Sequence, residues 1–168
     1  MNNPIPLDAE TRAAERPVDH KAELRLWLRM LTCSNLIEAE IRRRLAARFS
    51  VTLPRFDLLA QLDKAPDGLT LGETSRRMMV SNANVTTLVE RLVADGLISR
   101  RADPNDRRTA YVSLTPEGRS AFAAMARAHE QWIAELFHDL DPEDVARLMQ
   151  LLGKTRQSVG RATDGGKR

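Results

Sequence analysis

Residues that carry common catalytic or metal chemistry are scarce in this sequence. It has one cysteine, Cys33, and three histidines, His20, His129 and His138. One cysteine cannot form an intramolecular disulfide or a cysteine-rich metal site, and the histidines lack the spacing of metal ligands. No nucleophile stands beside a base, and no pair of acids stands out. The sequence therefore argues against an enzyme and predicts no metal or cofactor.

Long apolar runs are also absent. No run approaches the roughly 20 residues that are needed to cross a bilayer. The segment Met1–Val18 lacks the basic start and apolar stretch of a secretory signal. A single cysteine fits a reducing compartment. We therefore expect a soluble cytoplasmic protein with no membrane partner.

Aromatic residues and lysine are few. Aromatic side chains make up 4% of the chain against 42% for all apolar residues, so a core must be mainly aliphatic. The length of 168 residues suits one domain. Of the 26 cations, 22 are arginine, and they exceed the 23 acids by three. The guanidinium fork suits phosphate oxygens and base edges better than an ammonium does.

The first periodic segment, residues 19–49, predicts a long helix with two apolar faces. A small domain cannot bury both faces of such a helix, so we expect one face to pack on its own chain and the other on a second copy. One face carries Leu24, Trp27, Leu28, Leu31 and Asn35, and the other carries Met30, Cys33, Ile37, Ile41 and Leu45.

Five further helix starts have recognisable signals. Pro54 opens a helix that ends near Lys64. Thr70 and Glu73 form a capping box for a short helix to about Met78. Ser81 is the expected N-cap of a helix closed by Gly96, and the tight turn before it predicts a helix-turn-helix. Thr115-Pro116-Glu117 and Asp141-Pro142-Glu143-Asp144 start two more helices.

Two strand-like runs follow the helix-turn-helix. They are Leu97–Arg101 and Thr109–Leu114, and a turn-rich, charged tip at residues 102–108 joins them. A helix-turn-helix followed directly by a two-stranded hairpin is the winged-helix arrangement. The predicted fold is therefore mainly α with a small β-hairpin wing.

Positive charge gathers on this winged segment. Residues 76–108 hold seven cations against four acids, so their excess of three equals that of the whole chain. Such a cluster is often only a solvated surface, but here it coincides with an element suited to a duplex groove. Double-stranded DNA is the expected partner, and Arg76, Arg77 and Arg91 are expected to meet its phosphates.

Short polar side chains lie near the start of the second helix of the motif. Asn82 and Asn84 can pair with adenine, and the methyl groups of Thr86 and Thr87 can contact thymine. Both asparagines are poor helix formers, which favours a functional reason for them. Ser81 belongs to the same surface, although helix capping explains it equally well.

Three adjacent charges mark the hairpin tip. Arg107 or Arg108 can enter a narrow minor groove, and Asp106 can orient the arginine. The alternative is a solvated tip with a weak ion pair. Adjacent charges on an exposed tip gain little stability, so DNA contact is favoured.

The sequence of residues 70–118 resembles the MarR family of winged-helix transcriptional regulators. The most specific motifs are Asp106-Arg107-Arg108, Leu114-Thr115-Pro116-Glu117-Gly118 and Val85-Thr86. The resemblance covers about residues 19–158. It implies an obligate homodimer built from the N- and C-terminal helices, with the helix from Asn82 in the major groove of a pseudo-palindromic operator. Many members carry a basic residue where this chain has Thr87, so the operator sequence is not implied.

The expected organisation follows from these signals. Residues 1–18 form a disordered tail, 19–52 a dimerisation helix, 53–115 the DNA-binding winged helix-turn-helix, 116–158 the C-terminal dimerisation helices, and 159–168 a second disordered tail.

Within the family, Leu53–Leu59 and Ser81–Thr86 look most like members that control degradation of aromatic acids. We therefore expect a repressor that is released by a small anionic aromatic compound or an aromatic acyl-CoA thioester. Apolar residues and arginines of the first two helices suit such a ligand, while ordinary core residues and surface arginines remain an equal explanation. The candidate effector residues are Leu28, Arg29, Leu31, Arg42, Arg55, Phe56 and Leu59.

Two alternatives stay open. Some relatives sense peroxides through a cysteine in the first helix, but that cysteine would fall near Leu28 here, and only one tyrosine, Tyr111, is present. A cysteine inside a helix is more often a small buried residue, as expected for Cys33. The other alternative is a winged helix that binds protein, which leaves the arginines of the wing without a purpose.

Overall fold

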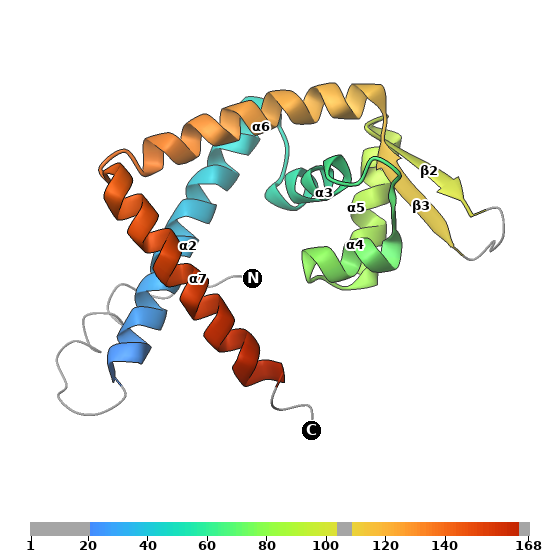
Figure 1. Ribbon diagram of the computed structural model, residues 1–168. Coiled ribbons are helices and arrows are strands. Elements are labelled where there is room, and N and C mark those ends of the chain that lie inside the picture. The colour runs from blue at the N-terminus through green and yellow to red at the C-terminus, as the bar shows by residue number, and fades with distance from the viewer. Residues whose placement is uncertain (1–20, 104–108, 165–168) are drawn as a thin grey trace. The chain divides into compact units, whose positions relative to one another are not determined.

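The computed structural model describes residues 21–103 and 109–164 (Figure 1). The predicted tail at residues 1–18 and the wing tip lie outside these residues. The chain divides into two compact units, one ending at His129 and one starting at Glu130. The elements in chain order are α2 (Lys21–Phe49), α3 (Leu53–Asp63), β1 (Leu69–Thr70), α4 (Leu71–Met78), α5 (Asn82–Ala94), β2 (Ile98–Ala102), β3 (Ala110–Leu114), α6 (Pro116–Leu136) and α7 (Pro142–Asp164).

Side-chain capping bonds confirm the predicted helix starts at Thr70, Ser81, Thr115 and Asp141, whereas α3, which begins at Leu53 beside Pro54, has no such bond. The Thr70 hydroxyl accepts from the Glu73 backbone N–H at 3.2 Å, and the Glu73 carboxylate accepts from the Thr70 backbone N–H at 2.8 Å. The Thr70 hydroxyl also donates to the Glu73 carboxylate at 2.7 Å. The bonds that this carboxylate accepts from the Thr70 backbone N–H and from the Thr70 hydroxyl, the backbone one first, hold the pKa of Glu73 below its ordinary value. The start of α4 is therefore fixed locally, as a capping box requires.

The sheet has one more strand than the sequence predicts. Its order is β1-β3-β2, and both pairings are antiparallel. β1 contains only Leu69 and Thr70, which lie opposite Val112 and Tyr111. A strand of two residues shows no alternation in the sequence, so only its pairing with β3 reveals it.

An aliphatic core holds the first unit together, as the composition predicts. Leu45 of α2, Leu58 and Leu59 of α3, Leu92 of α5 and Val112 of β3 are each 0% exposed. Because helices and sheet share this core, α5 has a defined place against α3 and α4 (Figure 1).

The start of α6 is tied to the end of α5. The Thr115 hydroxyl donates to the Gly96 carbonyl at 2.7 Å and accepts from the Gly118 N–H at 2.9 Å, so Thr115 is the expected N-cap. Gly118 is buried, and a Cβ there would lie 1.9 Å from the Leu97 carbonyl oxygen. The backbone approaches so closely here that only glycine fits.

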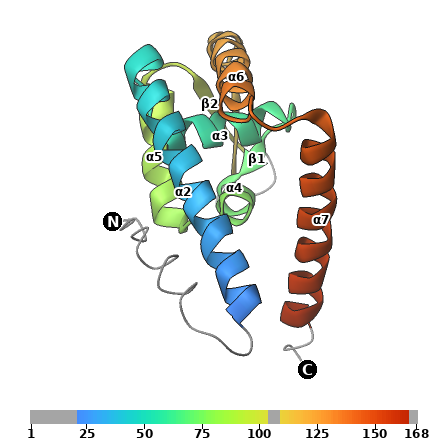
Figure 2. The same ribbon diagram turned by 90° about the vertical axis from the view of Figure 1, so that its left-hand side faces the viewer.

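The second unit contains the end of α6 and all of α7, which is one unbroken helix in Figures 1 and 2. Asp141 caps α7 by accepting from the Asp144 N–H at 2.8 Å, as predicted. The expected loose end from residue 159 is wrong at its start, because α7 continues to Asp164. Each residue added to an existing helix gains a backbone hydrogen bond without a new nucleation cost, so the helix passes Gly160.

The part of the chain that the structure describes contains no helix long and apolar enough to cross a membrane.

Candidate nucleic-acid interface

A tight turn joins α4 to α5. Met79 adopts a left-handed conformation with φ of 55° and is 91% exposed. The Val80 N–H donates to the Ser75 carbonyl at 3.2 Å, and the Ser75 hydroxyl donates to the Val80 carbonyl at 2.5 Å. These bonds fix the turn, and with it the direction in which α5 begins.

The first turn of α5 presents free amides. Ser81 caps the helix, because its hydroxyl accepts from the Asn84 N–H at 3.3 Å. Asn82 and Asn84 are exposed, and within the described residues their side chains make no hydrogen bond. An amide that no protein group uses is free to donate to and accept from a base edge.

The next turn presents methyl groups. The Thr86 hydroxyl donates to the Asn82 carbonyl at 2.9 Å, and the Thr87 hydroxyl donates to the Ala83 carbonyl at 3.2 Å. With both hydroxyls bonded to the backbone, the methyl is the part of each side chain that remains for contact. The opposite face of α5 is anchored by Val85, Val89 and Leu92, which are at most 2% exposed.

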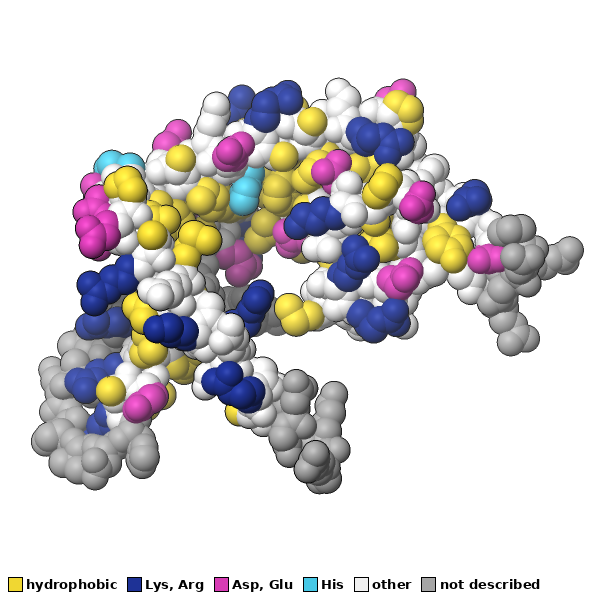
Figure 3. All heavy atoms as spheres, in the orientation of Figure 1, with side chains coloured by type: hydrophobic (Ala, Val, Ile, Leu, Met, Phe, Trp, Pro, Cys, Tyr) yellow, Lys and Arg dark blue, Asp and Glu magenta, His cyan; other side chains and the backbone are white. Residues whose placement is uncertain are grey.

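Cations surround this surface. Arg76 and Arg77 are exposed in the last turn of α4, and Arg91 is exposed in the last turn of α5. Figure 3 shows Lys and Arg side chains over α4 and α5, with acids between them. Asp106, Arg107 and Arg108 lie outside the described residues.

Two further arginines lie on the strand that leads to the wing. Arg100 and Arg101 of β2 are exposed, and the Arg101 guanidinium lies 5.8 Å from the centre of the Tyr111 ring. Arg100 also lines a cleft of about 270 Å³ beside the start of α4. The sequence shows that these two arginines are present, but only the pairing of β2 with β3 places their strand against α5.

The candidate effector residues have several different surroundings. Phe56 is buried, and its ring centre lies 5.6 Å from that of Phe122 and 5.0 Å from that of His129. Leu59 is fully buried in the core. Arg55 pairs with Asp95.

The remaining candidates lie on α2. Leu28 and Leu31 are half-buried, Arg29 is exposed, and Arg42 pairs with Glu38 on the same helix. The seven predicted residues therefore combine part of the core with the surface of α2 and with two arginines that already have carboxylate partners.

Titratable groups meet where Phe56 contacts α6. Burial lowers the pKa of His129, and the nearby Asp57 opposes that shift. Burial raises the pKa of Asp57, Glu38 raises it further, and His129 opposes the rise. This cluster joins α2, α3 and α6, and the residue patterns of the sequence did not predict it.

Cys33 is exposed on α2, so the expectation of a buried cysteine is wrong within this chain. Cys33 lies in the N-terminal half of α2, whereas the buried residues of this helix, Ile41 and Leu45, lie in its C-terminal half.

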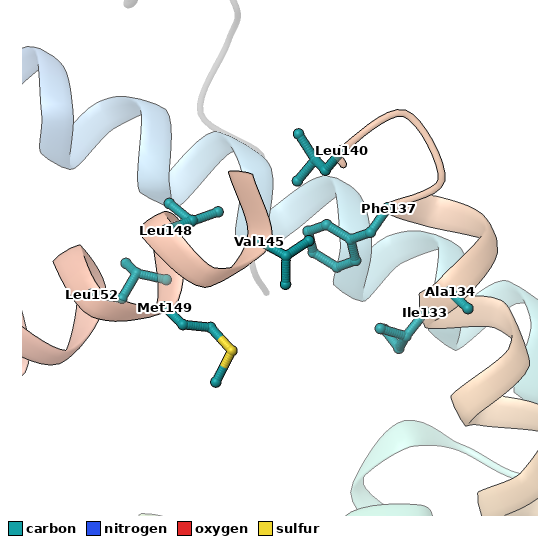
Figure 4. A pocket seen from close by; sticks show the side chains of 8 residues that line it. All are labelled: Ile133, Ala134, Phe137, Leu140, Val145, Leu148, Met149 and Leu152. Carbon is teal, nitrogen blue, oxygen red and sulfur yellow. The ribbon is translucent and has the colours of Figure 1, made fainter. Parts of the chain in front are cut away.

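The second unit carries an apolar groove of about 330 Å³ (Figure 4). Phe137 at its α6 side and Val145 of α7 point toward one another. Along α7, Leu148 is 42% exposed and Met149 is 70% exposed. The groove is lined by Ile133, Ala134, Phe137, Leu140, Val145, Leu148, Met149 and Leu152.

Known proteins match this chain over most of its length. The MarR family model matches residues 51–110. The chain is 28% identical over 158 residues to the transcriptional activatory protein BadR of Rhodopseudomonas palustris. This alignment covers 91% of this chain and 90% of BadR.

Solved structures agree with the sequence matches. A MarR family transcriptional regulator from Silicibacter pomeroyi is 30% identical, with a TM-score of 0.72 over 86% of this chain and 99% of that one. A mutant MarR from E. coli, solved with operator DNA, is 24% identical, with a TM-score of 0.69 over 82% of this chain and 99% of that one.

The winged helix-turn-helix, the exposed polar start of α5 and these matches have one explanation. The relatives regulate transcription and are not enzymes. The chain belongs to the MarR family and is a DNA-binding transcriptional regulator.

Proposed function

We propose that the protein is a ligand-responsive repressor that binds a pseudo-palindromic operator as a homodimer. The free amides of Asn82 and Asn84 at the exposed start of α5 carry this proposal. Two recognition helices can enter successive major grooves only when they are about 34 Å apart, which a dimer has to set.

Each part of the reading surface has its own role. Asn82 and Asn84 read base edges, Thr86 and Thr87 contact thymine methyls, and Ser81 caps α5 at the groove. Arg76, Arg77 and Arg91 meet phosphates. Arg108, with Arg107 and with Asp106 orienting it, enters the minor groove.

The dimer forms through residues 19–52 and 116–158, while residues 53–115 contact DNA. Large apolar side chains left open on α2 support this division, since Leu26 is 53% exposed, Trp27 55% and Leu36 63%. The groove on α7 supports it as well. An exposed apolar surface of this extent is typical of a face that a partner covers.

A small anionic aromatic compound or an aromatic acyl-CoA thioester releases the dimer from DNA. The cations for such a ligand are Arg29, Arg42 and Arg55, and the apolar contacts are Leu28, Leu31, Phe56 and Leu59. A ligand that favours another separation of the two recognition helices needs a coupling of only about 1–3 kcal/mol. A screen of aromatic acids and their thioesters for loss of DNA binding tests this. If no compound affects DNA binding, the proposal of an aromatic effector is wrong.

The sign of regulation needs its own measurement, because the relative BadR is named an activatory protein. Transcription in vitro from the promoter beside the protein's own gene should fall when the protein is added. A rise would make it an activator.

DNA binding is tested with the intergenic duplex beside its own gene and a scrambled duplex, at several salt concentrations. The wild type should prefer the intergenic duplex. Arg108→Ala should weaken binding by about tenfold and lower the salt slope by about one. Equal wild-type affinity for both duplexes would overturn sequence-specific regulation, and an unchanged Arg108→Ala would overturn the minor-groove role.

Exposure of Cys33 keeps the redox alternative open to a direct test. Peroxide should leave DNA binding of the wild type unchanged if a ligand is the signal. Loss of binding in the wild type but not in Cys33→Ser would favour a redox sensor instead.

A further inference from the structure

An ion pair joins α3 to the far end of the reading helix. The Arg55 guanidinium of the first turn of α3 pairs with the carboxylate of Asp95, the C-cap residue of α5, 40 positions away. The Arg55 side chain is 20% exposed and that of Asp95 is 48% exposed. The Arg55 Nε is buried and has no hydrogen-bond partner within the described residues.

Both charges lie at the helix end that disfavours them. The N-terminus of a helix carries partial positive charge, yet Arg55 lies in the first turn of α3. The C-terminus carries partial negative charge, yet Asp95 caps α5 there. Neither residue is therefore explained by the stability of its own helix, and the favourable interaction is the one between the two helices.

The pair acts on the end of α5 that lies away from the reading residues. The 13 residues of α5 span about 19 Å. A tilt of about 5° around its C-terminal end would move the first turn by roughly 1.5 Å, by this length. Base-edge hydrogen bonds tolerate only a few tenths of an ångström, so a tilt of this size would be enough to move the amides out of reach of their partners.

We propose that Arg55 and Asp95 are a positioning pair for operator recognition, which sets the tilt of α5 against α3. This inference rests on the proposed function, in which Asn82 and Asn84 read bases. The pair touches no base itself, and its effect is on the geometry of the residues that do.

Asp95→Asn separates positioning from simple electrostatics. The change removes a negative charge from the DNA-binding segment, so charge alone predicts tighter binding to every duplex. Positioning predicts about tenfold weaker binding to the intergenic duplex beside its own gene, with the scrambled duplex bound as well as before or better. Asparagine suits the end of α5, so the variant should fold, which thermal unfolding by circular dichroism confirms.

Glu90→Gln is the matched control. Glu90 is an exposed acid on α5, and the described structure gives it no ion pair. Its neutralisation should leave binding to both duplexes unchanged or slightly tighter. The contrast between the two variants isolates the pairing of Asp95 from its charge.

The exchanged pair Arg55→Asp with Asp95→Arg provides the rescue. It keeps the net charge and puts each charge at the helix end that favours it. Affinity for the intergenic duplex should return to within about threefold of the wild type, with a Tm at least as high.

Two results would overturn the inference. One is an Asp95→Asn variant that binds the intergenic duplex like Glu90→Gln, and the other is an exchanged pair that binds no better than Asp95→Asn. A wild type that binds both duplexes equally would instead overturn the proposed function, and the inference with it.

Discussion

Single residues set the local geometry of the DNA-binding unit. Ser81 and Thr70 begin helices with side-chain oxygens, and Thr115 both caps α6 and bonds to the turn after α5. Arg55 and Asp95 show the other case, in which a residue makes sense only through a partner far along the chain. Two predictions belong to this scale.

Gly118→Ala should destabilise the fold by at least about 2 kcal/mol, because the new methyl would meet the Leu97 carbonyl at 1.9 Å. Gly153→Ala in α7 is the control, since a Cβ there has no neighbour within 4 Å. Alanine at this helical position should raise the unfolding free energy by about 0.5–1 kcal/mol. Urea unfolding of both variants measures the difference, and equal stability of Gly118→Ala and wild type would contradict the close approach.

His129→Phe should reduce the loss of stability at mildly acid pH. Burial lowers the pKa of His129 in the folded state below its ordinary value of 6.5. The unfolded chain therefore binds this proton first, and stability falls as the pH drops through 6.5 toward the folded value. Phenylalanine keeps a ring against Phe56 and cannot titrate.

The measurement is Tm at pH 7.5 and at pH 5.5, where the wild type should lose more than the variant. In the folded state the pKa of Asp57 lies above its ordinary value of 3.8, so the folded chain binds this proton first and Asp57 adds stability as the pH falls further. Equal losses in both proteins would show that His129 does not contribute.

At the scale of elements, the helix-turn-helix depends on a turn with an unusual residue. Met79 is left-handed with φ of 55°, a conformation that costs a non-glycine residue energy. Its side chain is almost fully exposed, so burial of the side chain does little to offset the unfavourable backbone energy. The turn is nevertheless well determined by the bonds between Ser75 and Val80.

Met79→Gly should therefore raise the unfolding free energy by about 0.5–1 kcal/mol, less the extra freedom of glycine in the unfolded chain. DNA affinity should stay within about twofold, because the turn keeps its conformation. Chemical denaturation and a duplex titration check both parts. A loss of specific affinity without a loss of stability would assign the thioether a contact with DNA.

At the scale of the whole molecule, the proposed working unit is two chains. The apolar groove of the second unit and the exposed residues of α2 are the surfaces that this assembly would cover. The charge excess of three looks small for one chain, but it is concentrated on the reading unit of each copy.

Met149→Glu should break the dimer, because it puts a charge into the apolar groove on α7. We expect a shift toward monomer in sedimentation and a loss of operator affinity of at least about tenfold, since paired reading helices are lost. Gln150→Glu adds the same charge to an exposed polar position of α7 and should leave the dimer intact. A dimeric Met149→Glu would place the interface elsewhere.

Much of the fold is predictable from the sequence because its signals are local. The Thr70–Glu73 capping box, Ser81 and Asp141 act within one helical turn, and apolar spacing repeats with the helix period. The wing and its arginine-rich surroundings follow in the same way. The free amides of Asn82 and Asn84 also follow, since their exposure comes from the face of α5 opposite Val85 and Val89.

The sequence by itself determined the helix starts, the winged helix-turn-helix, the gathering of arginines in residues 76–108 and the family. Only the tertiary structure decided that Leu69–Thr70 forms a strand, that Cys33 is exposed and that Arg55 holds Asp95. The physical reason is range. Caps and periodic patterns depend on neighbours within a few residues, whereas a paired strand, an exposed side chain or a bridge across 40 positions depends on where the whole chain packs.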